Sequence, residues 1–412
     1  MEKKYALIGA HLSHSYSPKI HAELVGYNYG LVEIAQENLR DFVCGKEYAG
    51  YNVTIPYKKE IIKYLDSVEE IAREIGAVNT VVNKNGKLVG YNTDYYGIEY
   101  SLNSAGITLK GKKVVILGTG GTSLTARTLA KNSGAREIVI ISRSGENNYQ
   151  NYHLQKDAEI IINTTPVGMY PNNYQRLIDL EVFPNLEGVF DVIYNPTLTD
   201  LLSQAKKKGI KFSNGLPMLV AQAKKSAEYF IDKKIDDEKI EKVIASIEKQ
   251  IENIVLIGMS GCGKTTIGKM LAKKLNREFI DTDLEIVKRD GREIPIIFKE
   301  SGEAYFRNLE RQVLKDVGAL SGKIIATGGG VVENSENYFA LKQNGKIFYL
   351  QRKLENLDRK DRPLATDISA VESLFERRKE KYLAFADVNV DNDGDLQKTV
   401  GEIGKNYEDF SC

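Results

Sequence analysis

A glycine-rich segment in the second half of the chain limits the possible folds more than any other feature. Residues 254–257 are apolar and lead into the pattern Gly258-x-x-x-x-Gly263-Lys264-Thr265. Apolar residues then recur at 267, 271 and 275, the spacing of one helix face. A strand, loop and helix of this kind bind phosphate, because backbone N–H groups converge on one anion at a helix N-terminus. The segment predicts a nucleotide-binding α/β domain beginning near residue 254.

The residue types of this loop suit a nucleotide and its metal ion. Lys264 would place a positive charge on the outer phosphates, and the hydroxyl of Thr265 suits Mg²⁺. A chance glycine turn is the alternative, which the flanking apolar patterns disfavour. The predicted nucleotide-binding positions are Gly258, Gly261, Cys262, Gly263, Lys264, Thr265 and Thr266. Since such a loop lies near the start of its domain, a separate unit should precede it.

Composition indicates an ordinary globular protein of two or three domains. The 412 residues are 42% apolar and 27% charged. A net charge of +1 creates no overall field for nucleic acid or anionic lipid. The three cysteines, Cys44, Cys262 and Cys412, are too scattered for a disulfide framework, which favours apolar fillers in a reducing compartment. We expect a cytoplasmic protein without membrane or nucleic-acid partners, and the sequence leaves its oligomeric state open.

The first hundred residues alternate short strands and helices, with polar side chains at the strand ends. A strand over residues 5–8 precedes a hydroxyl-rich loop, and Pro18 suits a first helical turn. The serines at 13, 15 and 17 either bind a small anion or merely cap that helix. Further polar strand ends are residues 52–58, 79–80 and 92–94. We expect them to form the rim of one parallel sheet, where α/β proteins bind ligands.

A second nucleotide-binding pattern occupies residues 112–144. The apolar strand 112–117 leads into Gly118-Thr-Gly120-Gly121-Thr122-Ser123, a dinucleotide fingerprint with Ser123 in place of the usual third glycine. The next strand, 137–141, ends in Ser142-Arg143-Ser144 and lacks the acidic residue that holds the ribose of NAD. The alternative to a cofactor contact is that Arg143 is an ordinary exposed arginine at a strand end, beside Glu146. A guanidinium suits a 2′-phosphate, so the pattern favours NADP.

Residues 1–249 resemble shikimate dehydrogenases. The blocks that match this family in order are His14-Ser15-Tyr-Ser17-Pro18, Asn52-Val-Thr54-Ile-Pro-Tyr-Lys58, Ala77-Val-Asn79-Thr80, Asn92-Thr-Asp94, Asn163-Thr164-Thr-Pro-Val-Gly-Met169, Asp191-Val-Ile-Tyr194-Asn-Pro196 and Met218-Leu-Val-Ala-Gln222. The resemblance implies a three-layer α/β substrate domain from about 1–100 and 215–249. A Rossmann-like NADP domain, about 101–214, would be inserted in it.

The resemblance also implies residue roles. Lys58 and Asp94 would be catalytic at the reacting oxygen. The implied substrate contacts are Ser15, Ser17, Thr54 and Tyr194 at the carboxylate, Asn79, Asp94 and Gln222 at the hydroxyls, and Asn52. The implied cofactor contacts are Gly118, Gly120, Gly121, Thr122, Ser142, Arg143, Ser144, Thr164, Gly215 and Met218. The chemistry agrees, because hydride transfer to a ketone builds negative charge on an oxygen that needs a donor. Whether Lys58 is a true acid or an electrostatic anchor stays open.

The chain departs from this family after Arg143. Only nineteen residues separate Arg143 from Asn163, and they look like a loop where the family usually has a helix and a strand. The second basic residue common after the arginine is missing as well. The resemblance therefore implies a shortened adenosine side of the cofactor site.

Residues 254–412 resemble shikimate kinases. After the phosphate loop, the matching blocks are Phe279-Ile-Asp281-Thr-Asp283, Tyr305-Phe306-Arg307, Ala326-Thr-Gly328-Gly329-Gly330, Arg362-Pro363-Leu364 and Arg378-Lys-Glu-Lys-Tyr382. By this resemblance Asp283 binds substrate hydroxyls and acts as base, Arg307 and Arg378 clamp the carboxylate, and Gly329 and Gly330 approach the ring. Asp281 joins Thr265 at Mg²⁺. Arg362 lies on a lid at about 354–367 and, with Lys264, contacts the transferred phosphoryl group. The family usually has an arginine that contacts adenine at the position of Glu355, and Arg359 is a candidate to replace it.

The predicted function is a bifunctional shikimate-pathway enzyme. NADPH reduces 3-dehydroshikimate to shikimate, and ATP then phosphorylates the hydroxyl so formed, giving shikimate 3-phosphate. The alternatives are a working kinase with a degenerate N-terminal binding module, and an NAD-dependent quinate or shikimate dehydrogenase fused to the kinase, which Arg143 disfavours. An amphipathic helix at 236–250 leaves a linker at only 250–253. So short a linker motivates the hypothesis that shikimate passes directly between the sites.

Overall fold

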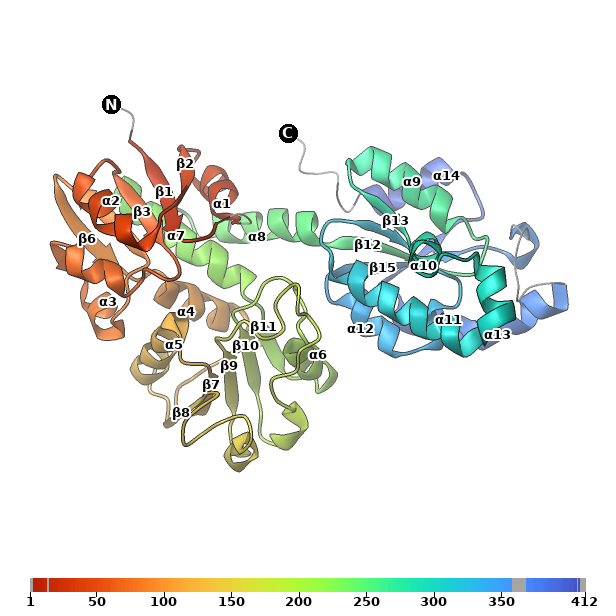
Figure 1. The fold of residues 1–412 in the computed structure, drawn as a ribbon, viewed down its shortest axis with the longest axis horizontal. Helices are drawn as coiled ribbons and strands as arrows, with labels where there is room; N and C mark the ends of the chain where they lie inside the picture. Colours follow the sequence, from red (N-terminus) through yellow and green to blue (C-terminus); the bar gives the residue numbers. More distant parts are fainter. Residues whose placement is uncertain (1–2, 13–14, 358–367, 406, 408–412) are drawn as a thin grey trace. The chain divides into compact units, whose positions relative to one another are not determined.

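The computed structural model describes residues 3–12, 15–357, 368–405 and 407. It divides the chain into two compact units, Met1–Ala245 and Ser246–Cys412, both built from sheets and helices (Figure 1). The predicted α/β class is confirmed. The division lies within helix α8 (Glu238–Ile251), and strand β12 (Asn253–Ile257) begins after a single residue. The predicted linker therefore falls on the end of a helix and the start of a strand. Among the described helices, none has the length and apolarity needed to span a bilayer.

The first part of the first unit is a mixed sheet with the strand order β2-β1-β3-β5-β6-β4. Its elements are β1 (Tyr5–Gly9), α1 (Ser17–Leu24), β2 (Tyr29–Glu33), α2 (Leu39–Gly45), β3 (Gly50–Val53), β4 (Ser67–Val68), α3 (Glu70–Ile75), β5 (Thr80–Lys84), β6 (Lys87–Tyr91), α4 (Asp94–Ser104) and α7 (Leu216–Ile231). Tyr5 and Leu7 of β1 join one apolar cluster with Phe230 of α7, whereas Ala6 and Ile8 join another with α2 and α3. Because both faces of the sheet are buried, the domain has the predicted three layers.

The expected parallel rim is wrong in one strand. β1 and β3 are parallel, but β5 runs antiparallel to both β3 and β6. Thr54 follows the end of β3 and Asn92 follows the end of β6, whereas Asn79 precedes the start of β5. Since β5 runs in the opposite direction, its first residue meets the last residues of its neighbours. The polar residues therefore still gather at one edge of the sheet.

The inserted part of the first unit is a parallel sheet with the order β11-β10-β9-β7-β8. Its elements are β7 (Lys113–Leu117), α5 (Gly121–Asn132), β8 (Glu137–Ile141), β9 (Ile160–Asn163), β10 (Gly188–Asp191), α6 (Asp200–Lys207) and β11 (Lys211–Ser213). Residues 142–159, all of them described, contain one 3-10 turn (Tyr152–Gln155) and an isolated bridge between Ser142 and Asn148. The prediction that the stretch after Arg143 is loop-like is confirmed, and β8 is an edge strand of this sheet.

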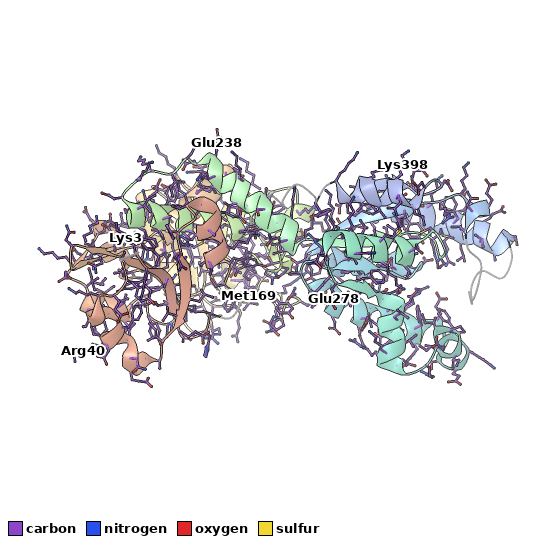
Figure 2. The ribbon with its side chains drawn as sticks, turned by 90° about the horizontal axis from the view of Figure 1, so that it is seen from above. Lys3, Arg40, Met169, Glu238, Glu278 and Lys398 are labelled. Carbon is purple, nitrogen blue, oxygen red and sulfur yellow. The ribbon has the colours of Figure 1, made fainter. Side chains whose placement is uncertain are left out.

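The second unit is a parallel sheet with the order β13-β14-β12-β15-β16. Its elements are β12, α9 (Lys264–Leu275), β13 (Phe279–Asp281), α10 (Thr282–Asp290), α11 (Ile294–Ala319), β14 (Ile324–Ala326), α12 (Glu336–Lys342), β15 (Gly345–Gln351), α13 (Ile368–Phe385), β16 (Val388–Asp391) and α14 (Leu396–Gly404). Every residue of the central strand β12 is buried. Figure 2 draws the side chains of this unit, with Glu278 and Lys398 labelled. The predicted parallel-sheet domain around the phosphate loop is confirmed.

Candidate active sites

The edge of the first sheet where the polar strand ends gather holds a lysine and an aspartate in direct contact. Lys58 Nζ donates to Asp94 Oδ2 at 2.6 Å, and the two side chains are only 19% and 8% exposed. Asn79 Nδ2 donates to the other oxygen of Asp94 at 3.0 Å. This carboxylate therefore fixes the ammonium while it is itself held by an amide. Such a pair differs from a solvated surface salt bridge, because both partners are largely removed from water.

A hydroxyl that sequence reasoning missed supports this pair. The buried Ser226 Oγ lies 2.8 Å from Thr80 Oγ1 and 2.9 Å from Thr93 Oγ1, and it donates to Gln222 O. Thr93 in turn lies within hydrogen-bond distance of the side chains of Asn79 and Gln222. Ser226 follows Gln222 by four residues on α7, so helical spacing could have placed both on one face. The network links the predicted hydroxyl-binding residues through one serine.

Asn52 belongs to the same network. Its Nδ2 donates to Ser226 Oγ at 2.8 Å and to Thr80 Oγ1 at 2.9 Å, and its Oδ1 accepts from Tyr29 OH at 2.7 Å. His21 stacks on Tyr29, and burial lowers the His21 pKa to about 3, so this ring stays neutral. These bonds make Asn52 a support of the site, and its contact with substrate stays a prediction.

The predicted carboxylate-binding residues lie near the loop after β1. Ser15 Oγ donates to Ser17 Oγ at 3.1 Å and accepts from Ser17 N at 3.2 Å. Tyr16, between them, packs edge-on against Tyr194 with ring centroids 6.0 Å apart. A Cβ on Gly9 would lie 2.6 Å from the Thr54 methyl group, so Thr54 approaches the start of the same loop. Four residues from distant blocks are thus brought to one region.

The fingerprint loop stands at the point where the strand order of the inserted sheet reverses. Gly118 has φ +105°, and a Cβ on it would lie 2.9 Å from Thr164 Oγ1, so the loops after β7 and β9 touch there. Ser123, which replaces the third glycine, is buried and donates its hydroxyl to Gly118 O at 2.7 Å. A Cβ on Gly121 would lie 4.0 Å from Lys58 Cδ. The first turn of α5 therefore faces the Lys58–Asp94 pair.

The other predicted cofactor residues occupy different surroundings. Ser142 Oγ donates to Ser144 O at 2.6 Å, which closes a turn with the exposed Arg143 at its centre. Thr122 lies in the first turn of α5, beside the exposed Gly120. Gly215 N donates to Ile193 O at 2.9 Å, at the entry to α7. Met218 packs in the apolar cluster around Ile98 and Leu102, so its side chain is mainly core.

The phosphate loop of the second unit has the conformation that the motif predicts. Gly258, Gly261 and Gly263 have φ values of +145°, +76° and +100°, which favour glycine. Lys264 is buried, and its ammonium donates to Gly258 O and Met259 O at 2.9 Å. Thr265 Oγ1 donates to Asp281 Oδ2 at 2.7 Å. A hydroxyl and a carboxylate are thus adjacent at the mouth of the loop.

The cysteines differ from one another. Cys262 lies within the phosphate loop and is buried as predicted, but its Sγ accepts a contact from Lys264 Nζ at 3.9 Å. Cys44 is exposed, so the filler prediction is wrong for that residue, and Cys412 lies outside the described residues.

A cavity of about 530 Å³ opens beside this loop. Asp283, Arg307 and Arg378 line it together with Lys264, Thr265, Thr266, Asp281 and Gly328 to Gly330. Removal from water, together with the negative charge of Asp281, raises the pKa of Asp283 to about 6. Arg307 Nη1 donates to Glu310 Oε2 at 2.9 Å, and Arg378 Nε donates to Glu333 Oε1 at 2.7 Å. The two predicted guanidiniums therefore share one cavity with the predicted base.

The glycines of the triple-glycine segment allow close approach of chain segments. A Cβ on Gly329 would lie 2.8 Å from Ser260 N of the phosphate loop, and one on Gly330 would meet the Arg307 guanidinium. Only glycine leaves room for these neighbours. The sequence carried no motif for Glu310 and Glu333, which hold the two arginines. Arg359 and Arg362, predicted for the lid, lie outside the described residues.

Comparisons with known families agree with both halves of the chain. A family model for shikimate dehydrogenase substrate binding domains matches residues 7–81, and one for shikimate kinases matches residues 260–408. The shikimate dehydrogenase (NADP(+)) of Clostridium beijerinckii is 34% identical over 267 residues, covering 60% of this chain and 99% of that protein. That of Alkaliphilus oremlandii is 39% identical over 253 residues, covering 54% of this chain and 88% of that protein.

Solved structures resemble the first part of the chain. A chorismate mutase/shikimate 5-dehydrogenase fusion protein from Clostridium acetobutylicum superposes with a TM-score of 0.58 and 34% identity, covering 60% of this chain and 98% of that chain. The shikimate 5-dehydrogenase from Listeria monocytogenes, in complex with shikimate and NAD, superposes with a TM-score of 0.54 and 31% identity. It covers 59% of this chain and 96% of that chain.

Proposed function

We propose how the two sites work in a chain that belongs to the shikimate dehydrogenase family and also carries a shikimate kinase domain. The protein is a bifunctional shikimate-pathway enzyme that uses NADP, ATP and Mg²⁺, as predicted from the family resemblances. One observation supports the residue roles most directly: in each unit a charged pair or cluster stands beside a nucleotide-binding loop. Lys58 faces Gly121 in the first unit, and Asp283 shares a cavity with Lys264 in the second.

In the dehydrogenase site, Lys58 donates a hydrogen bond to the carbonyl oxygen of 3-dehydroshikimate. NADPH, when bound, supplies the hydride. Asp94 orients the ammonium through the 2.6 Å contact, and Asn79 restrains the far oxygen of Asp94. A donor fixed in this way stabilises the developing oxyanion without reorganising during the reaction. Ser15, Ser17, Thr54 and Tyr194 bind the substrate carboxylate, and Gln222 binds a ring hydroxyl.

In the kinase site, Asp283 accepts the proton of the attacking hydroxyl. ATP with Mg²⁺, when bound, supplies the phosphoryl group. Arg307 and Arg378 hold the carboxylate of shikimate, and Gly329 and Gly330 leave room for the ring. Lys264 and the loop amides place positive charge at the phosphates, which is most of what phosphoryl transfer requires. Arg362 and Arg359 remain predicted partners of the nucleotide.

The residues present fit the cofactors. Thr265 Oγ1 and Asp281 Oδ2 lie 2.7 Å apart, and two such oxygens suit Mg²⁺ when phosphates complete the shell. A Cβ on Gly120 would meet nothing within 4 Å, so a ligand can reach the backbone at the start of α5. Arg143, exposed at the end of β8, suits the 2′-phosphate of NADP.

We also propose module boundaries and a location. The dehydrogenase module is 1–249, with its substrate domain at about 1–100 and 215–249 and its NADP domain at about 101–214; 250–253 is the linker and 254–412 the kinase module. The match at 7–81 and the match at 260–408 support this division. The three scattered cysteines support a cytoplasmic location. A net charge of +1 supports an enzyme of small molecules without nucleic-acid or membrane partners.

Two assays on single variants test the function. We expect Lys58→Ala to lower NADPH oxidation with 3-dehydroshikimate by about 10²-fold or more while shikimate-dependent ADP formation persists. Lys264→Ala should lower shikimate-dependent ADP formation while NADPH oxidation with 3-dehydroshikimate persists. Lys59→Ala and Lys269→Ala, which remove exposed neighbouring lysines, are matched controls. A wild type that phosphorylates shikimate but never oxidises NADPH would favour the degenerate-module alternative. Faster turnover with NAD and quinate than with NADP and shikimate would favour the alternative of an NAD-dependent quinate or shikimate dehydrogenase fused to the kinase.

A further inference from the structure

A carboxylate beside the kinase cavity holds three cations. Glu333 lies in a 3-10 turn (Val331–Glu333) directly after the triple glycine, and its side chain is 15% exposed. Oε1 accepts from Arg378 Nε and from Arg377 Nη2, each at 2.7 Å, and Oε2 accepts from Lys381 Nζ at 2.6 Å. Partial burial alone would raise the pKa of Glu333, but the hydrogen bonds from Lys381, Arg378 and Arg377 outweigh it and bring the pKa to about 2. The carboxylate is therefore ionised throughout the neutral range.

Of these cations, Arg378 is the one that lines the cavity. Its side chain is 4% exposed, whereas those of Arg377 and Lys381 are 56% and 42% exposed. Arg378 Nη1 donates to Gly329 O at 3.2 Å, and Tyr382 OH donates to the same oxygen. Two sides of the guanidinium are thus tied to the protein.

The remaining nitrogen of the Arg378 guanidinium, Nη2, lacks a hydrogen bond of this kind to any described residue. Nη2 is buried and has no hydrogen-bond partner within the described part of the chain. Leaving a buried charged donor unpaired is costly, so an acceptor from a ligand in the cavity is expected. A carboxylate oxygen of the substrate fits this requirement, because guanidiniums bind carboxylates with short, charge-assisted hydrogen bonds.

We propose that Glu333 is the positioning residue of the substrate clamp and aims Arg378 Nη2 at the carboxylate of shikimate. The inference rests on the proposed function, in which Arg378 binds that carboxylate. An arginine side chain loses considerable rotamer freedom when it is fixed, so a partner that fixes it beforehand removes this cost from substrate binding. Glu333 accepts from Nε, leaves Nη2 available to the ligand, and touches no reacting atom.

A purely electrostatic role makes the opposite prediction. The negative charge of Glu333 offsets part of the positive charge of Arg377, Arg378 and Lys381. If this were its main effect, removing the charge would strengthen attraction of the anionic substrate and lower the KM for shikimate. Positioning predicts that the same change raises this KM.

The experiment compares Glu333→Gln with matched variants in the full-length protein, measuring kcat and the KM values for shikimate and ATP separately. We expect Glu333→Gln to raise the KM for shikimate about tenfold and to leave the KM for ATP within about twofold. Glu333→Asp, which keeps the charge on a shorter side chain, should recover part of the loss. Arg377→Ala and Lys381→Ala, which remove the exposed partners of the same carboxylate, should leave both constants unchanged.

Arg378→Ala distinguishes a failure of the positioning role of Glu333 from a failure of the proposed contact between Arg378 and the substrate carboxylate. If Arg378→Ala raises the KM for shikimate and Glu333→Gln leaves it unchanged or lowers it, the positioning role is overturned and the clamp stands. If Arg378→Ala leaves the KM for shikimate unchanged, the clamp itself is overturned. An unchanged KM for ATP shows that each variant folds, and Glu333→Asp replaces Glu333→Gln as the deciding variant should the latter misfold.

Discussion

At the scale of single residues, carboxylates fix the cations in both proposed active sites. Asp94 holds Lys58 at 2.6 Å, Glu310 holds Arg307 at 2.9 Å, and Glu333 holds Arg378. A charge held in advance needs little reorganisation when a ligand arrives, which is the physical basis of electrostatic catalysis. Asp283 differs from these three, because it faces the cavity as an acceptor and has a raised pKa.

The raised pKa of Asp283 predicts a pH dependence for the kinase reaction. A general base must be deprotonated, and removal from water and the charge of Asp281 move this pKa to about 6. We therefore expect kcat/KM for shikimate to fall tenfold per pH unit below about pH 6 and to level off above it. Asp283→Asn should lower the rate by about 10²-fold or more and abolish this dependence. A wild-type profile that stays flat from pH 5 to 7.5 would contradict the role of Asp283 as base.

Arg143 predicts which nicotinamide cofactor the enzyme prefers. Its guanidinium is exposed and forms no ion pair with any described residue, and the turn closed by Ser142 and Ser144 holds it at the end of β8. We expect Arg143→Ala to raise the KM for NADPH about tenfold and to leave the KM for NADH unchanged. Arg127→Ala, an exposed arginine of α5, is the control. Equal effects on both cofactors would mean that Arg143 does not contact the 2′-phosphate.

At the scale of elements, the triple-glycine segment sets how closely two loops approach. A Cβ on Gly329 would press on the backbone of Ser260 at 2.8 Å, so Gly329→Ala must displace the phosphate loop. We expect kinase activity to fall by about 10²-fold, since small displacements at such a site are costly, while NADPH oxidation is unchanged. Gly401→Ala is the control, because its Cβ would meet nothing within 4 Å. That change should leave both activities intact and stabilise α14 by about 0.5–1 kcal/mol.

A buried aspartate connects three elements of the inserted domain and predicts how stability changes with pH. Asp191, at the end of β10, accepts from Asn163 Nδ2 at 2.9 Å and from Thr199 Oγ1 at 2.7 Å. Burial raises its pKa to about 7 in spite of these bonds. Between about pH 4 and pH 7 the unfolded chain has lost this proton and the folded protein keeps it. The contribution of Asp191 to the free energy of unfolding therefore falls as pH rises, by up to about 1.4 kcal/mol per pH unit.

Thermal unfolding of Asp191→Asn across this range checks the sign. An asparagine cannot ionise, so we expect the stability of the wild type to decline relative to the variant from pH 4.5 to 7. Asp200→Asn, a more exposed carboxylate at the start of α6, is the comparison. If the difference in unfolding temperature between the wild type and Asp191→Asn stays constant over this pH range, the raised pKa of Asp191 is contradicted.

Sequence reasoning identified the elements that carry motifs and missed those set by tertiary contacts. The phosphate loop, the strand before Gly118 and the polar strand ends were predictable, because glycine geometry and apolar runs act locally. The direction of β5 was not, since a short apolar strand reads the same in either direction. Ser226 and Glu333 lie outside the family blocks, and their importance comes from partners distant in sequence.

At the scale of the whole molecule, the residues assigned to each substrate site all come from a single unit. The dehydrogenase residues belong to the first unit and the kinase residues to the second. The dehydrogenase residues lie between 15 and 226, and those of the kinase cavity between 259 and 378. The hypothesis of direct transfer between the sites, which rests on the short linker, therefore makes a prediction that separate sites do not make.

Isotope dilution tests that hypothesis. Labelled 3-dehydroshikimate, NADPH and ATP are given together with excess unlabelled shikimate, and the label in shikimate 3-phosphate is measured. Because the residues assigned to each site lie within one unit, we expect shikimate to be released and the label to be diluted fully. An equimolar mixture of Lys58→Ala and Lys264→Ala supplies the reference, since transfer within one chain is impossible there. Label retained by the wild type above this reference would show that shikimate passes between the sites without mixing with the solution.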